Sequence, residues 1–222
     1  MMPTTPSRVR RWLKSSKAIK QWSDVGVFYV KLTVDPSALE TQPVVVGIDP
    51  GKLYSGIGVQ SSRCTLFMVH LELPFKSVKK RMETRSMMRR TRRSRRIDHT
   101  KPFELRNHHQ VRFNNRKSKK VAPSIRANRQ IELRVVTELA RIFPVSKIVW
   151  EYVKADVDLT SGRKKARSGK GFSAVMGGQQ WAIEQLSKLA PVAKQFGWQT
   201  ANIRRQLGLA KAKNKAIARQ WG

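Results

Sequence analysis

Two carboxylates lie in apolar, strand-like runs of the sequence. Asp49 ends the run 44–48 and is followed by a Pro-Gly turn, and Glu151 interrupts the run 148–153. An uncompensated buried carboxylate is expensive, so Glu151 is either ion-paired or faces a polar site. Asp49 by itself could equally cap a hairpin turn. If the two lie on neighbouring strands, their oxygens would be a natural nucleus for a Mg²⁺ site.

The segments around Asp49 predict a sheet. Residues 44–49, 55–60 and 64–73 form three consecutive strand candidates joined by short turns. Three antiparallel strands, the first ending in Asp, open an RNase H-like α/β fold with a mixed sheet and flanking helices. Sugar-kinase and actin-like ATPases open similarly, but they need a second phosphate loop and a large second domain, which do not appear. Cys64, the single cysteine, is predicted to be a buried strand residue.

The hydrophobic pattern also predicts the helices and strands around Glu151. A helix following Pro123 places Ile131, Val135, Leu139 and Ile142 on one face, and residues 146–153 form the strand with Glu151. We further expect a helix over 177–190 and a short strand over 198–203. Near the chain start, a short helix (8–14) precedes a strand (27–34).

The charge balance points to a polyanionic partner. The 222 residues contain 46 Lys and Arg against 14 Asp and Glu, a formal charge of +32. Nucleic acid is the expected partner, because each phosphate contact releases a counterion. Charge alone does not separate an enzyme from a scaffold. No apolar stretch approaches the roughly 20 residues of a membrane span, so we expect a cytoplasmic, nucleoid-associated protein without a membrane partner.

The cationic residues concentrate in a predicted helix over 75–97, which contains no Gly or Pro. Such a helix is cationic over most of its circumference. Its charges would be neutralised by phosphate groups if the helix lay between nucleic-acid backbones. The alternative is a disordered basic tail or localisation-type signal. The candidate nucleic-acid-binding residues are Arg81, Arg85, Arg89, Arg90, Arg92, Arg93, Arg95 and Arg96, with Arg112 and Arg116 in the irregular segment 98–123 and Lys164 and Lys165 in the loop 154–172.

The ordered set of motifs resembles the insertion-sequence-encoded RNA-guided nucleases IscB, and most closely their HNH-less relatives IsrB. Residues 47–51 resemble the first RuvC motif, and residues 149–151 the second. Residues 89–96 match the arginine-rich bridge helix whose RRxRR pattern names the associated domain, residues 112–116 the segment after it, and Met2-Pro3 with the following helix the N-terminal PLMP module. The resemblance implies a guide RNA, a target DNA, a Mg²⁺ cofactor, and catalytic, metal-binding roles for Asp49 and Glu151.

Two features depart from the full family pattern. All four histidines (His70, His99, His108 and His109) precede Glu151, so the inserted HNH nuclease of IscB is absent, as in the nickase-like IsrB branch. The third RuvC motif places a His and an Asp after the last strand, whereas the last acidic residue here is Glu184, which we expect to be solvent-exposed. We therefore expect a chain truncated at both ends, with the third motif supplied by a separate chain or a downstream segment.

These observations give a domain layout and two functions. The layout is a PLMP-like module (1–43), a first RuvC segment (44–74), the bridge helix (75–97) and a second, incomplete RuvC segment (98–222). The leading hypothesis is an RNA-guided DNA-binding protein with a RuvC-like, Mg²⁺-dependent nickase site for the non-target strand. The alternative is a catalytically inactive guide-RNA and DNA-binding remnant or regulator.

Overall fold

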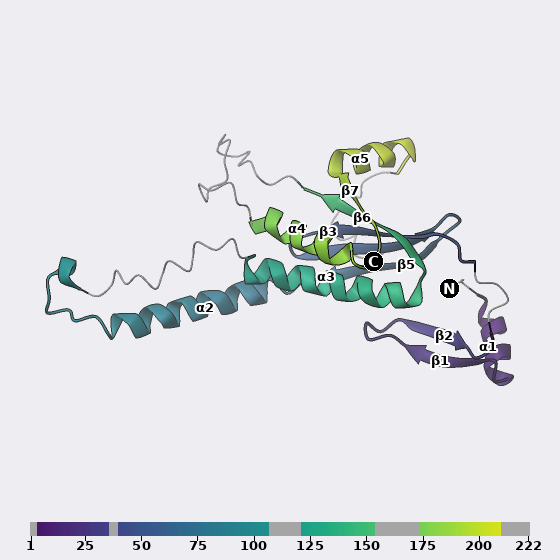
Figure 1. Cartoon of the computed structure of the whole chain (residues 1–222), viewed down its shortest axis with the longest axis horizontal. Helices are drawn as coiled ribbons and strands as arrows, with labels where there is room; N and C mark the ends of the chain where they lie inside the picture. Colours follow the sequence, from purple (N-terminus) through teal and green to yellow (C-terminus); the bar gives the residue numbers. More distant parts are fainter. Residues whose placement is uncertain (1–3, 36–39, 107–120, 154–173, 210–222) are drawn as a thin grey trace.

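The computed structural model describes residues 4–35, 40–106, 121–153 and 174–209 (Figure 1). The helices are α1 (Pro6–Lys14), α2 (Phe75–Ser94), the 3-10 turn η1 (Phe103–Leu105), α3 (Pro123–Ile142), α4 (Ala174–Leu186) and α5 (Gly197–Gln206). The strands are β1 (Ala18–Trp22), β2 (Phe28–Leu32), β3 (Val44–Pro50), β4 (Tyr54–Ser61), β5 (Thr65–Glu72), β6 (Val145–Tyr152) and β7 (Val192–Phe196).

The main sheet has five strands in the order β5-β4-β3-β6-β7. Strands β3, β4 and β5 form an antiparallel meander, and β6 and β7 continue the sheet parallel to β3. This is the order and direction of strands in an RNase H-like fold, which confirms the predicted fold class. The parallel arrangement places the ends of β3 and β6, with Asp49 and Glu151, at the same edge.

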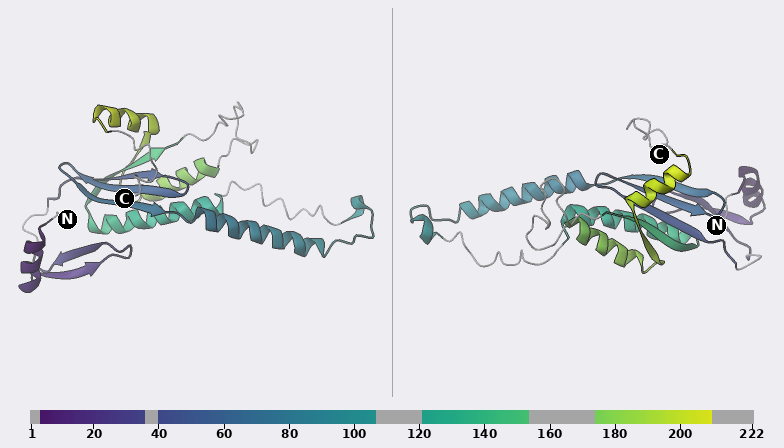
Figure 2. Two further views of the ribbon diagram at one scale, coloured as in Figure 1. Left: turned by 180° about the vertical axis from the view of Figure 1, so that it is seen from behind. Right: turned by 90° about the horizontal axis from the view of Figure 1, so that it is seen from above.

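One face of the sheet is covered by helices and carries the core. Burial alternates along β3 and β4, so Val46, Ile48, Ile57 and Val59 are buried while their neighbours face the other side. Side chains of α3 and α4 pack against this buried face, and Trp150 of β6 is fully enclosed. Apart from α5 beside β7, no described helix covers the opposite face along β3, β4 and β5 (Figure 2).

A small unit precedes the main sheet. Helix α1 contacts β1, and β1 pairs with β2 as a two-stranded antiparallel hairpin. The sequence predicted α1 and β2 but not β1. Val25, in the turn of the hairpin, packs against the main core, so the hairpin lies against the body of the molecule (Figure 1).

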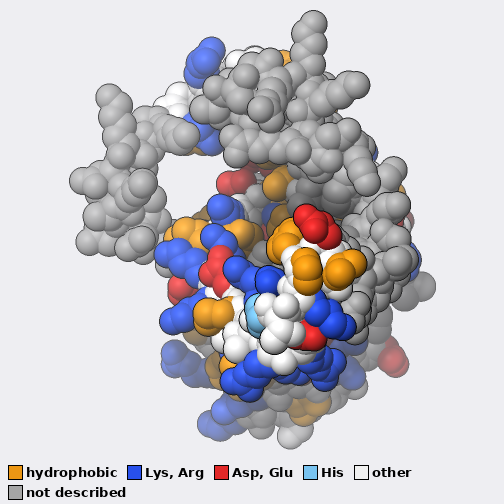
Figure 3. Space-filling view, turned by 90° about the vertical axis from the view of Figure 1, so that its left-hand side faces the viewer, with side chains coloured by type: hydrophobic (Ala, Val, Ile, Leu, Met, Phe, Trp, Pro, Cys, Tyr) orange, Lys and Arg blue, Asp and Glu red, His pale blue; other side chains and the backbone are white. Residues whose placement is uncertain are grey.

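Helix α2 forms an arm that contacts α3 near the sheet and then extends away from the body (Figures 1 and 2). It buries no residue completely, although Val78 and Met82 are half-buried. Seen from its far end, Lys and Arg side chains surround much of the arm (Figure 3). The predicted helix is confirmed for residues 75–94, and Arg95 and Arg96 follow its end.

Two local predictions were wrong, and a third held only in part. Residues 198–203 belong to α5 and not to a strand; the strand is β7, and the Gln199 side chain accepts a hydrogen bond from the Phe196 amide at the helix start. Cys64 is exposed in the turn between β4 and β5. On α3, Val135 and Leu139 are buried and Ile142 packs against the core, as expected. Ile131 is only half-buried, and the buried face also includes Asn128, Arg129 and Glu132.

Candidate active site

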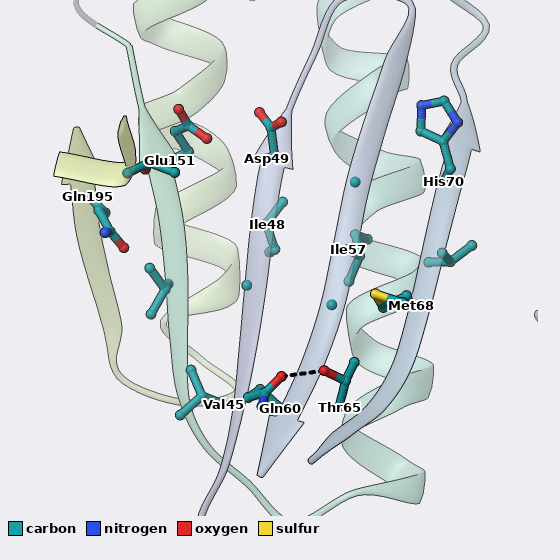
Figure 4. A pocket seen from close by; sticks show the side chains of 16 residues that line it. Val45, Ile48, Asp49, Ile57, Gln60, Thr65, Met68, His70, Glu151 and Gln195 are labelled. Atoms are coloured by element: carbon teal, nitrogen blue, oxygen red, sulfur yellow. Dashed lines mark hydrogen bonds between the residues drawn. The ribbon is translucent and has the colours of Figure 1, made fainter. Parts of the chain in front are cut away.

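Asp49 and Glu151 lie side by side at one end of the sheet. Ile48 pairs with Trp150 in the parallel ladder between β3 and β6, so Asp49 and Glu151 are the next residues on neighbouring strands. Because side chains alternate along a strand, both carboxylates point to the open face (Figure 4). Asp49 is exposed and Glu151 is half-buried.

The turn after Asp49 depends on glycine and on a buried hydroxyl. A Cβ at Gly51 would collide with the Tyr54 carbonyl oxygen, so no side chain fits there. The Ser55 hydroxyl donates a hydrogen bond of 3.0 Å to the Asp49 carbonyl oxygen across the hairpin. These contacts fix the backbone on which the Asp49 carboxylate stands.

A buried polar cluster of α3 supports the same turn from below. Asn128 donates to the Lys52 carbonyl at 2.9 Å, and Arg129 donates to the Gly51 carbonyl at 3.2 Å. The Arg129 guanidinium also donates to both oxygens of Glu132, at 2.8 and 2.6 Å. Burial raises the pKa of Glu132 above its ordinary value and Asp49 adds to the rise, while Arg129 acts against it.

Contacts with α4 and α5 hold the region of Glu151. Gln179 of α4 is buried, accepts from the Val153 amide at 3.1 Å and donates to the Val153 carbonyl at 2.8 Å. On the other side, a Cβ at Gly197 would lie 3.2 Å from Oε1 of Glu151. Gly197 is the first residue of α5, so the carboxylate lies at a helix N-terminus, where the helix dipole favours negative charge.

The two carboxylates stand at the end of an open groove of about 900 Å³ (Figure 4). Gly56 lies opposite both Asp49 on β3 and His70 on β5, and Glu151 lies opposite Gln195 on β7. A row of groove-lining residues therefore crosses the sheet from Gln195 through Glu151 and Asp49 to His70. The sequence analysis did not assign His70 to this site. The available indication was that His70 lies in a predicted strand, on the face that the structure leaves open.

The predicted nucleic-acid-binding residues are only partly brought together. Arg81, Arg85, Arg89, Arg90 and Arg92 are exposed on α2, Arg93 is half-buried there, and Arg95 and Arg96 are exposed after its end. They follow the arm and do not line the groove described above. Arg112, Arg116, Lys164 and Lys165 lie outside the described residues.

The donor set suits one hard cation. Mg²⁺ prefers carboxylate oxygens, keeps several waters, and is commonly held by one or two carboxylates. Asp49 and Glu151 meet that requirement from adjacent strands. In the described ranges, no group of three His, Cys, Asp or Glu side chains converges as a metal site. Glu184 is exposed on α4, as expected, and does not line the groove.

Comparison with known proteins identifies a family whose sequence model matches this chain. The sequence model of the family described as "RRXRR protein" matches residues 1–172. Among solved structures, the chain is similar to T. thermophilus RuvC in complex with Holliday junction substrate, with 13% identity, a TM-score of 0.34, and coverage of 78% of this chain and 83% of that chain. At these values the similarity carries no functional information. A search of curated proteins found no match. None of the described helices is long and apolar enough to cross a membrane.

Proposed function

The chain belongs to the RRXRR protein family, and from that premise we propose that it is an RNA-guided DNA-binding protein of the IscB/IsrB type. In this proposal, Asp49 and Glu151 are two ligands of a RuvC-like, Mg²⁺-dependent site for nicking the displaced, non-target strand, and this site is incomplete among the described residues. The observation that carries the proposal is the placement of these two carboxylates on adjacent parallel strands of an RNase H-like sheet.

The chain's own residues have distinct parts in this proposal. Asp49 and Glu151 would hold the cation between them, one exposed to the approaching strand and the other set against the start of α5. The bound Mg²⁺ would supply activation of a water molecule and stabilisation of the leaving oxygen. The cluster of Arg129, Glu132 and Asn128 would keep the turn after Asp49 in place.

The arm would grip the guide RNA and its heteroduplex with the target strand. Guanidinium groups pair with phosphate oxygens in a planar fork, and the exposed arginines of α2 are distributed along its length. Such contacts read backbone and shape, while base pairing with the guide supplies sequence specificity. The domain layout of a PLMP-like module, split RuvC segments and a bridge helix is part of the same proposal.

One observation favours the alternative, a catalytically inactive binding protein. The groove contains two carboxylates among the described residues, and a third metal ligand is not part of that set. We therefore expect nicking by this chain alone to be weak or absent. A third motif supplied by a separate chain or a downstream segment would restore it.

The test begins with RNA that co-purifies with the full chain. Its sequence defines complementary DNA targets, which are then assayed for binding and for nicking in Mg²⁺ with wild type and Asp49→Asn. We expect specific, salt-sensitive binding by both proteins. Failure of any RNA to co-purify, with no guide-dependent DNA binding, would contradict the proposed function. Strong nicking that Asp49→Asn abolishes would contradict the inactive alternative.

A further inference from the structure

Part of the open face of the sheet carries no side chains, because glycines occupy it. Gly47 of β3 and Gly56 and Gly58 of β4 all line the groove, and we call these three residues the glycine floor. Gly47 pairs directly with Gly58, and Gly56 pairs with Asp49. The floor therefore begins beside the candidate metal ligands and continues along the two central strands.

Packing within the described chain does not require these glycines. A Cβ added at Gly47 or Gly58 would meet no described atom within 4 Å, and one at Gly56 would meet only the Asp49 Cβ, at 3.9 Å. None of the three has a positive φ. A glycine inside a strand is destabilising relative to alanine, and it often marks a site where a ligand approaches the backbone closely.

Beyond the two carboxylates, the described side chains that line the groove are apolar or uncharged polar, with one aromatic ring, that of His70. Met68 and His70 of β5 stand on one side, and a hydrogen bond of 2.7 Å from Thr65 to Gln60 closes the end away from the carboxylates. The His70 ring stacks on Tyr54, with the ring centroids 5.0 Å apart. None of the described lining residues is Lys or Arg, so the groove suits the sugars and bases of a nucleic acid better than its phosphates.

We propose that the glycine floor binds unpaired nucleotides of a DNA or RNA strand that lie next to the phosphate at Asp49 and Glu151. This inference rests on the proposed function and specifies how its substrate lies. Sugars and bases would rest on the bare backbone, with Met68 and the His70 ring offering contacts for a base. From Gly56 to Gln60 the strand rises about 13 Å, room for about four nucleotides at a stacked spacing of about 3.4 Å.

The experiment fills the floor without disturbing the chain. Gly58→Val and Gly47→Val each place a β-branched side chain at a position where an added Cβ meets no described atom within 4 Å, and valine is favourable in strands. Gly58→Ala is a milder variant at the same position. Gln21→Val is the matched control, because it adds the same side chain to β1 with no change of charge, outside the groove.

The probe is a short, fluorescein-labelled oligothymidylate with a photoreactive 4-thiothymidine, added to the full chain with its co-purified RNA. Ca²⁺ replaces Mg²⁺ to prevent cleavage. We expect wild type and Gln21→Val to crosslink the probe on β4 or β5. Gly58→Val and Gly47→Val should lose that crosslink, bind the probe about tenfold more weakly, and keep their RNA and their thermal stability.

Three results would overturn the proposal. Unchanged crosslinking and affinity in both valine variants would show that the floor is not the binding site, while leaving the proposed function intact. A loss of stability in Gly58→Ala relative to the control would show that another segment of the chain already occupies the floor. If the wild-type protein carries RNA but crosslinks the probe only through α2, the proposed nucleotide-binding site on the glycine floor is contradicted, while the proposed RNA guidance is not.

Discussion

Arg129 and Glu132 form a buried ion pair beneath the turn that follows Asp49. Their side chains are 8% and 1% exposed, and the shortest distance between the guanidinium and the carboxylate is 2.6 Å. Arg129 also reaches the Gly51 carbonyl and places its guanidinium carbon 5.4 Å from the centroid of the Trp150 ring. Trp150 directly precedes Glu151. The Arg129 side chain therefore contacts both the turn that follows Asp49 and the residue that precedes Glu151.

The first prediction concerns this ion pair. Removing one partner leaves the other charge buried and uncompensated, so Arg129→Met or Glu132→Gln should lower the free energy of unfolding by about 3–5 kcal/mol. The double variant Arg129→Met/Glu132→Leu should be less destabilised than the Arg129→Met single variant, because no buried charge remains. Urea unfolding of the three variants measures these differences.

The exposed pair of Lys79 and Glu83 on α2 is the matched control. Its charged atoms are 3.6 Å apart and the two side chains are 61% and 65% exposed. Removing either partner should change the free energy of unfolding by less than about 0.5 kcal/mol. Equal effects at the two pairs would contradict the supporting role of Arg129 and Glu132.

The second prediction follows from the electrostatic contact between Asp49 and Glu132. Burial is the main cause of the raised pKa of Glu132 and Asp49 adds to it, so both disfavour the ionised form of Glu132 in the folded protein. A raised carboxyl pKa makes ionisation cost stability as pH rises above the unfolded value, near 4.5. Asp49→Asn removes part of that cost. It should therefore raise Tm at neutral pH, with the gain disappearing as pH falls below the unfolded value.

Glu184→Gln is the control for this effect. It also removes one negative charge, but from an exposed position on α4. Thermal unfolding of both variants across the acid range separates a local effect from the change in net charge. A Tm gain of equal size in the two variants, or one that persists in acid, would contradict the coupling of Asp49 to Glu132.

The sequence predicted the pair Asp49 and Glu151 because strand patterns are local. Each carboxylate interrupts a run of apolar residues, and the strand order of an RNase H-like sheet then places the two runs side by side. Gly51 was readable as a turn residue for the same reason. His70 was not identified, because its nearness to Asp49 arises only when β5 pairs with β4 and Gly56 leaves the space between them open.

The cluster on α3 could not be predicted from hydrophobic periodicity. Arg129 and Glu132 are charged, so an amphipathic pattern places them in solvent. The expected core face therefore contained only apolar residues: Ile131, Val135, Leu139 and Ile142. A usable signal was their spacing: positions 129, 132, 136 and 139 follow one face of a helix. The assignment of residues 198–203 failed for a related reason: Trp198, Thr200 and Ile203 favour strands locally, but these residues form α5, directly after the edge strand β7 of the described sheet.

The third prediction concerns Gly197, which leaves room for Glu151. An alanine there would bring its Cβ to 3.2 Å from Oε1, so the carboxylate would have to move by a few tenths of an ångström. We expect Gly197→Ala to weaken Mn²⁺ binding, measured by electron paramagnetic resonance, several-fold relative to wild type. Stability should not fall, since alanine is a better helix residue than glycine.

Asn202→Ala is the control for Gly197→Ala, because it makes a similar change in helix propensity at an exposed position of α5. Its Mn²⁺ affinity should equal that of wild type. If Gly197→Ala also binds Mn²⁺ like wild type, then the position of the Glu151 carboxylate does not determine cation binding. Asp49→Asn, measured in the same series, sets the level expected when a proposed ligand is lost.

The fourth prediction concerns the arm. Replacing Arg89, Arg92 and Arg96 by glutamine removes three exposed cations that the proposal places on nucleic-acid phosphates. RNA affinity should fall, and the slope of log K against log salt concentration should decrease by about 0.7–0.9 for each lost contact. The control replaces Lys147, Lys188 and Lys194, three exposed lysines away from α2, and so removes the same net charge. A similar change of slope in both triple variants would mean that RNA responds to total charge, and the arm would lose its assigned role.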